Sequence, residues 1–258
     1  MSVQAVGNTG RVFLPVAPDY SHISMAWKPF RNSLEGLLVP APAGAFRVAL
    51  QLDVTAVSVV RESGSVIRRW PLEGMTLTQL ETEMRQVFTY QGLNGAAFSV
   101  RSINPIDANV LGADEQFAFT GQRDAVAELA RYFELSSQVL CDFSSANALN
   151  VTPRVWPHHF DYSLLMHLEG GAGDSGGSVS LGMSPGDKYY DQPYFYATPW
   201  PYPDCELLPE GPVPAHWHRS EWTGLVLMAT DLLNQTSQKR VLAVFWKHAY
   251  RILKNLVN

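Results

Sequence analysis

Residues 155–168, which read VWPHHFDYSLLMHL, combine an apolar alternation with three of the chain's seven histidines. Successive side chains point to opposite faces of a strand. An extended backbone here therefore places His159 and Asp161 together on one face and directs His158 to the other. Because proline cannot donate to a strand ladder, Pro157 must lie at the start or on an edge of this strand. The segment thus predicts a strand that presents a histidine and a carboxyl group side by side.

The N-terminal half predicts a β-hairpin followed by a helix. Residues 46–60 and 66–70 are rich in Val and flank a short polar turn, which is typical of a hairpin with a longer loop. Thr76 and Gln79 have the spacing of a capping box, in which each side chain satisfies a backbone N–H of the other. Apolar residues then recur at helical spacing, and Gly92 is a natural helix end.

Two further helices are predicted, at residues 122–143 and from Ser237 to the C-terminus, whereas residues 1–20 predict an irregular arm. The last helix has a wide apolar face. Its polar face is either solvated or a contact site for anionic lipid or an acidic partner. That face carries basic residues and no acidic ones: Lys239, Arg240, Lys247, Arg251 and Lys254.

The order of these elements predicts an α+β fold, with a mainly antiparallel β-sheet packed with three to four helices, including a long C-terminal helix. A chain of 258 residues with 46% apolar residues suits one domain over residues 1–258. The alternative is two lobes, an N-terminal lobe over residues 1–150 and a β-rich C-terminal lobe over residues 151–258 with the closing helix.

Composition excludes several classes of protein. A net charge of -5 argues against binding to nucleic acid, which requires a basic footprint. Two cysteines form no disulfide framework, so we expect a cytoplasmic, reducing environment. The chain has no apolar run near the roughly 18 residues of a membrane span and no signal-like start, so we expect no membrane association.

The histidines predict a site for a divalent metal ion such as zinc. Five of the seven fall between positions 158 and 218. Imidazole and carboxylate are common zinc ligands, and catalytic zinc takes three protein ligands and a water. We expect His159, Asp161, His216 and His218 as ligands, the last two alternating onto one strand face, with His158 as a candidate catalytic base. The alternative is that these histidines only bind backbone carbonyls.

A second candidate surface is polar and aromatic. Asp187, Tyr194, Tyr196 and Trp200 lie in a proline-rich run of short strands and turns. Aromatic faces with a few polar groups suit a small polar ligand, so these four residues are predicted to bind one. The alternative is that tyrosine is an ordinary strand residue with a half-buried ring.

Several blocks of the chain are rich in Trp, His and Pro: WPHHFD at 156–161, SPGD at 184–187, PYFY at 193–196, PWPYP at 199–203 and HWH at 216–218. With these blocks the chain resembles an uncharacterised bacterial protein family, a domain of unknown function. The resemblance covers most of the chain, which implies one integrated unit, and it implies no reaction, cofactor or site residue.

Three functional hypotheses follow. The first is a metal-dependent hydrolase or lyase that acts on a small polar substrate through the His/Asp cluster. The second is a non-catalytic protein that binds a small ligand or a protein partner with its Tyr- and Trp-rich surface. The third is a structural protein in which the His and Trp blocks serve only the core.

Overall fold

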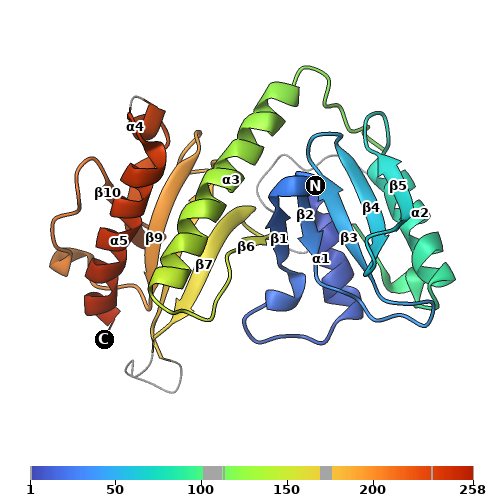
Figure 1. The fold of residues 1–258 in the computed structure, drawn as a ribbon, viewed down its shortest axis with the longest axis horizontal. Coiled ribbons are helices and arrows are strands. Elements are labelled where there is room, and N and C mark those ends of the chain that lie inside the picture. Colours follow the sequence, from blue (N-terminus) through green and yellow to red (C-terminus); the bar gives the residue numbers. More distant parts are fainter. Residues whose placement is uncertain (1, 101–111, 113, 169–175, 234, 258) are drawn as a thin grey trace. The chain divides into compact units, whose positions relative to one another are not determined.

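The computed structural model has an α+β fold with antiparallel strand pairing, and its last helix, α5 (Gln238–Val257), is long. The predicted fold class is therefore confirmed. The chain falls into two units (Figure 1), and the number of domains stays a prediction. Unit 1 comprises Met1–Arg131 and Arg154–Phe160, and unit 2 comprises Tyr132–Pro153 and Asp161–Asn258. The structure describes residues 2–100, 112, 114–168, 176–233 and 235–257.

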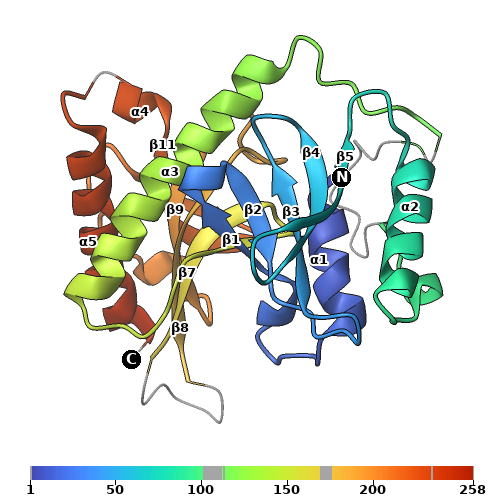
Figure 2. The same cartoon turned by 45° about the vertical axis from the view of Figure 1, so that its right-hand side comes forward.

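The strands of unit 1 pair in the order β6-β1-β2-β3-β4-β5. The predicted hairpin exists as β4 with β5, but residues 46–60 form two strands rather than one, because a turn at residues 52–55 ends β3 and Thr55 takes a φ of 44°. Figure 2 shows β3, β4 and β5 beside one another. The strands are β1 (Met25–Lys28), β2 (Ser33–Gly36), β3 (Phe46–Gln51), β4 (Ala56–Arg61), β5 (Val66–Pro71) and β6 (Arg154–Trp156).

Helix α2 (Leu77–Tyr90) begins with the predicted capping box. The Thr76 hydroxyl accepts the Gln79 N–H at 3.1 Å, and the Gln79 side-chain oxygen accepts the Thr76 N–H at 2.9 Å. Such a box satisfies two donors that a helix end otherwise leaves orphaned. Gly92 follows the helix with a φ of +85°, a conformation that glycine adopts without strain. The predicted start and end of this helix are confirmed.

The prediction of an irregular arm at residues 1–20 was wrong over Ser2–Phe13, which form helix α1. Its glycines serve close packing rather than breaking the helix. A Cβ at Gly7 would lie 2.8 Å from Cγ of Pro157, and one at Gly10 would overlap the carbonyl oxygen of His22. A contact this close requires glycine, whose cost in helix propensity is about 1 kcal/mol relative to alanine.

Unit 2 contains a sheet in the order β10-β11-β9-β8-β7. Strand pairing aligns Leu164, Leu181, Ala197 and Leu225 in one buried apolar row across β7, β8, β9 and β11. The elements are α3 (Arg123–Ala146), of which Tyr132–Ala146 belong to this unit, β7 (Asp161–His167), β8 (Ser178–Ser184), β9 (Tyr194–Trp200), β10 (His216–Ser220), β11 (Trp222–Met228), α4 (Thr230–Leu233) and α5.

Helices α3 and α5 pack on the apolar face of this sheet. Phe133 of α3 meets the Tyr162 ring at 6.0 Å, and Trp246 of α5 meets the Phe195 ring at 5.9 Å. None of the described helices is both long enough and apolar enough to cross a bilayer. The opposite face carries a different row, Ser163, Gly182, Tyr196, Val226 and His216, which runs across all five strands of unit 2 that the structure describes.

The single strand predicted over residues 155–168 is interrupted by a turn at residues 157–160. The Phe160 N–H donates to the Trp156 carbonyl at 2.7 Å, and Phe160 takes a φ of 54°. Pro157 has no N–H to offer a ladder, so the chain leaves the sheet there. The predicted alternation of His158 and His159 was therefore wrong: both lie in the turn, with ring centroids 4.6 Å apart.

Candidate functional site

Two histidines of β10 converge on one tyrosine hydroxyl. His216 and His218 lie two residues apart on the strand, so their side chains share the face that carries Tyr196. The hydroxyl oxygen of Tyr190 lies 3.1 Å from Nε2 of His216 and 3.0 Å from Nδ1 of His218. His216 and His218 therefore lie on one face of the strand, as predicted.

The direction of each hydrogen bond follows from the donors and acceptors present. Nε2 of His218 lies 2.6 Å from the Ser220 carbonyl oxygen, which can only accept. Nε2 therefore carries a proton, and in the uncharged ring this leaves a lone pair at Nδ1. The single Tyr190 proton is donated to that lone pair. His216 then donates its Nε2–H to the Tyr190 oxygen, and this defines one proton chain from His216 to Ser220.

Aromatic packing holds His218 in place. The ring stacks on Trp222 with centroids 4.2 Å apart and an interplanar angle of 20°, and the Tyr189 ring contacts it edge-on at 4.8 Å. His218 is buried, at 8% exposure, whereas His216 is exposed. The cluster therefore has a fixed interior histidine and an accessible outer one.

Asp187 fixes the loop that carries Tyr190, which follows β8. One Asp187 carboxyl oxygen accepts the backbone N–H groups of Tyr189 at 2.8 Å and Tyr190 at 3.1 Å. The other accepts the Tyr194 hydroxyl at 2.7 Å. Gly186 takes a φ of +126°, which glycine permits. The predicted ligand-binding residue Asp187 thus positions the loop.

Tyr196 lies beside Tyr194 on the same face of β9. Its hydroxyl donates to a carboxyl oxygen of buried Asp161. The ring crosses Gly182, where a Cβ would lie only 2.6 Å from the Tyr196 hydroxyl oxygen. A glycine at this cross-strand position lets the ring lie flat over the sheet and reach Asp161 on β7.

The tyrosine hydroxyls of this face remain protonated at neutral pH. Burial, followed by the charge of Asp161, raises the pKa of Tyr196 well above its ordinary value. Burial and the hydrogen bond to Asp187 raise the pKa of Tyr194, and burial and the charge of Asp187 raise that of Tyr190. Removing a phenol from water disfavours its charged form. These side chains therefore act as neutral donors.

The predicted catalytic base His158 and the predicted metal ligand His159 belong to unit 1. Burial, with a further contribution from the charge of His159, lowers the pKa of His158 to about 4, so His158 is neutral near pH 7. His159 is exposed. The structure brings Asp161, His216 and His218 onto one face in unit 2, while His158 and His159 occupy the turn at residues 157–160 in unit 1.

Over the part of the chain that the structure describes, no group of three or more His, Cys, Asp or Glu side chains is arranged to hold a metal ion. Tyr190 is the third side chain of the cluster with His216 and His218, and it was not among the residues predicted to hold a metal. The signal for it was the turn at 184–187, which folds the following residues back toward β9. Trp200 lies at the far end of β9, 58% exposed, with its ring against Tyr202.

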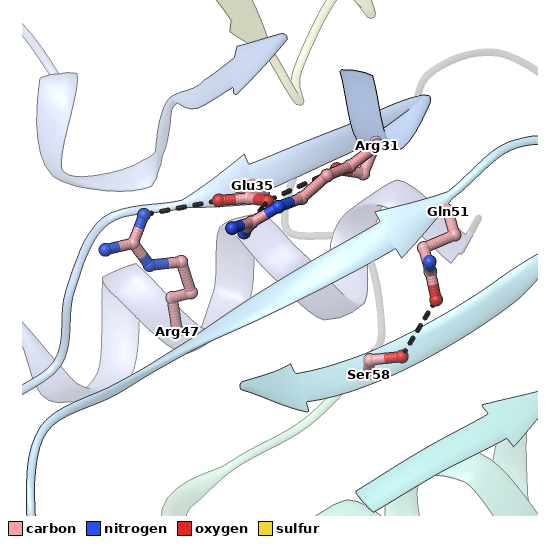
Figure 3. A network of polar contacts seen from close by, with 6 residues as sticks. Arg31, Glu35, Arg47, Gln51 and Ser58 are labelled. Carbon is pink, nitrogen blue, oxygen red and sulfur yellow. Dashed lines mark hydrogen bonds and ion pairs between the residues drawn. The ribbon is translucent and has the colours of Figure 1, made fainter. Parts of the chain in front are cut away.

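Unit 1 contains a different polar network, drawn in Figure 3. Glu35 is 4% exposed, and Arg31 and Arg47 approach its carboxylate from opposite sides at 3.1 and 3.2 Å. On the neighbouring strands, the Ser58 hydroxyl donates to the Gln51 side-chain oxygen at 3.2 Å. Each Glu35 carboxyl oxygen is bound by a guanidinium group, so this network stabilises the fold of unit 1.

No family model, curated protein or solved structure matches the chain. The resemblance to a bacterial domain of unknown function therefore stays a prediction.

Proposed function

We propose that unit 2 binds a divalent first-row metal ion, such as zinc, through His216, His218 and Tyr190, and that this ion acts on a small polar substrate. The observation that carries the proposal is the convergence of two imidazole nitrogens on a single hydroxyl oxygen. Imidazole is a preferred ligand of zinc, copper, iron and nickel.

The spacing of the donors supports a shared ion. Ligands about 2.0 Å from a tetrahedral ion lie about 3.3 Å from one another. The nitrogen-to-oxygen distances of 3.0 and 3.1 Å are close to that value, although they are also those of hydrogen bonds. Both nitrogens therefore lie at about the distance from the Tyr190 oxygen that fellow ligands of one ion would have.

The surroundings of His218 have the form that supports metal ligands. A metal-binding histidine commonly donates its other ring N–H to a carboxylate or backbone carbonyl, which fixes the tautomer. His218 does this through the Ser220 carbonyl at 2.6 Å, so its Nδ1 lone pair already faces the site. Stacking on Trp222 fixes the ring orientation. His216 is exposed, which leaves one side accessible to water and substrate.

An ion held by three protein donors keeps a position for water, and it would lower the pKa of that water and polarise a substrate oxygen. This chemistry supports the hydrolase or lyase hypothesis. His158 and His159 are outside the proposed ligand set. Asp187 positions Tyr190, and Asp161 engages Tyr196 on the same face.

The test is titration of chelator-treated, tag-free protein with Zn²⁺ by calorimetry and with Co²⁺ by visible absorption. We expect one ion per chain and a tetrahedral cobalt spectrum. His216→Ala should weaken binding at least about tenfold. Tyr190→Phe should weaken it to a smaller degree. His167→Ala is the matched control, since it removes another exposed histidine from a strand of unit 2.

Binding below one ion per chain, or equal affinities for His216→Ala and His167→Ala, would overturn the proposal. Hydrolysis of p-nitrophenyl acetate and p-nitrophenyl phosphate by the zinc-loaded protein then tests the reaction class. Here the same variants should lose turnover in proportion to bound metal.

A second candidate is non-catalytic binding of an uncharged polar ligand, favoured by the neutral hydroxyls and half-buried rings of Tyr189 and Tyr190. Sugar-like ligands are held by such rings and donors. Titration of metal-free protein with a panel of mono- and disaccharides, followed by the fluorescence of Trp222, tests this function. Saturable quenching in the absence of metal would favour ligand binding as the function. The absence of a response to every sugar of the panel would contradict it.

A further inference from the structure

A hollow of about 670 Å³ lies between α3 and α5, within unit 2. Its floor is apolar: the Phe143 and Tyr250 rings meet edge-on at 5.3 Å, flanked by Val139 and Ala243. This hollow lies outside the histidine cluster, because both helices pack on the apolar face of the sheet and the cluster occupies the opposite face.

One wall of the hollow is strongly basic. Lys239, Lys247, Arg251 and Lys254 line it, all on α5 and all exposed. Asp142 is the one acidic residue among the residues that line it, and it pairs with Lys239 at 2.9 Å. The chain as a whole has a net charge of -5, so this concentration of positive charge is local. Because Asp142 pairs with Lys239, the other three cations have no further acidic side chain among the lining residues of the hollow.

The shape of the basic row indicates an elongated occupant. Lys239 and Lys254 are fifteen residues apart on one helix, which corresponds to about 22 Å along its axis. A small anion would use only one or two of these cations. A peptide helix of similar length could place acidic residues along the whole row and apolar residues on the floor, which is the helix-in-groove mode of recognition.

We infer that the groove between α3 and α5 binds an acidic amphipathic peptide segment of a protein partner. Charge complementarity selects acidic residues for the α5 wall, and the Phe143–Tyr250 floor accepts apolar anchors. A lipid surface fits less well, because the apolar face of α5, including Trp246 and Leu253, is already buried. Nucleic acid also fits less well, because a single row of four cations offers few phosphate contacts.

The test uses a fluorescein-labelled 16-residue helical peptide, about 24 Å long, with Glu on one face and Leu on the other. Fluorescence anisotropy measures its binding to the full chain at low salt. We expect saturable binding that weakens at about 0.5 M salt, because exposed ion pairs are screened. A peptide with Lys in place of every Glu should not bind.

Two pairs of variants on α5 locate the site. Lys247→Glu should weaken binding about tenfold or more, whereas Arg240→Glu, which changes the net charge equally but lies outside this groove, should change it less than about threefold. Ala243→Trp fills the groove without changing charge and should also weaken binding. Its control is Val244→Trp, at the adjacent exposed residue, which lines a different hollow.

Equal effects within both pairs would overturn the inference, as would failure of the acidic peptide to bind. Two competitors test the other occupants. Citrate that displaces the peptide at concentrations near the peptide's own dissociation constant would assign the groove to a small anion. Preferential binding of phosphatidylserine vesicles or of a 20-nucleotide oligo(dT), abolished by Lys247→Glu, would assign it to lipid or nucleic acid.

Discussion

Each unit contains a polar network around one buried side chain, Glu35 in unit 1 and His218 in unit 2, but the networks differ in charge. In unit 1, the Glu35 carboxylate is held between the guanidinium groups of Arg31 and Arg47. In unit 2, neutral hydroxyl and imidazole groups join Tyr190 to His216 and His218. In the charged network two guanidinium groups share one carboxylate, whereas the neutral network ends at an exposed histidine.

This difference indicates a structural role for the charged network of unit 1 and a binding role for the neutral network of unit 2. A buried carboxylate requires its partners, since an uncompensated buried charge costs several kcal/mol. Neutral donors tolerate rearrangement, because a tyrosine or histidine can exchange one hydrogen bond for another or give up a proton to a metal ion. We therefore expect substitutions in unit 1 to change stability most and substitutions around Tyr190 to change binding most.

The largest expected effect is that of Glu35→Ala. It leaves Arg31 and Arg47 without their shared carboxylate, and we expect the free energy of unfolding to fall by about 2–4 kcal/mol. The lower part of that range is favoured because Arg31 is 58% exposed and water can replace part of the interaction. Urea unfolding followed by circular dichroism measures the change. The control Glu62→Ala, at an exposed site, should cost less than about 0.5 kcal/mol. If the two variants lost the same unfolding free energy, Glu35 would have no special structural role.

Two tyrosines of unit 2 allow a comparison between the loss of a hydrogen bond to a buried carboxyl group and the loss of one to an exposed carboxyl group. Tyr196→Phe removes a donor from buried Asp161, and we expect a loss of about 1–3 kcal/mol. Tyr194→Phe removes a donor from exposed Asp187, which keeps two backbone N–H donors, so the loss should be below about 1 kcal/mol. Thermal unfolding of both variants measures the two losses of unfolding free energy. A larger loss for Tyr194→Phe than for Tyr196→Phe would contradict this prediction.

His158 predicts a pH dependence in unit 1. Burial and the neighbouring His159 lower the pKa of His158 from 6.5 to about 4 in the folded protein. Between these values the unfolded chain binds more protons than the native one, so stability rises as the pH increases from about 4 to about 6.5 and is flat above. Because the ring is partly exposed, we expect a contribution of about 1–2 kcal/mol. His158→Gln should remove this part of the slope of unfolding free energy against pH, whereas His167→Gln, at an exposed site, should retain it.

Patterns that depend on neighbouring residues were predictable from the sequence. The capping box at Thr76 and Gln79 specifies its own hydrogen bonds, and the alternation of His216 and His218 follows from strand geometry wherever the strand is straight. The fold class followed from such local elements. The metal and ligand assignments needed contacts between distant segments, and they stay predictions.

The missed features depend on contacts that the local pattern does not contain. Gly7 and Gly10 have a low propensity for helix, yet they lie within α1, where Pro157 and His22 approach too closely for a side chain. Phe160 departs from the strand because its N–H closes a turn on Trp156. Tyr190 joins the histidines because Asp187 folds its loop back, which spacing along the chain could not reveal.

The smallest expected effect concerns the charge nearest the neutral cluster. Lys188 donates a hydrogen bond of 2.6 Å to Glu221, which lies between β10 and β11, and this bond raises the pKa of Lys188. Both side chains are exposed, so Lys188→Met should leave the unfolding midpoint unchanged. The substitution removes a cation and frees a carboxylate near His218, so Zn²⁺ should bind about two- to fivefold more tightly at low salt and without change at about 0.5 M salt. Glu221→Gln should shift the affinity the other way. Calorimetry measures both shifts, and identical shifts for the two variants would show that the pair does not influence the histidine cluster.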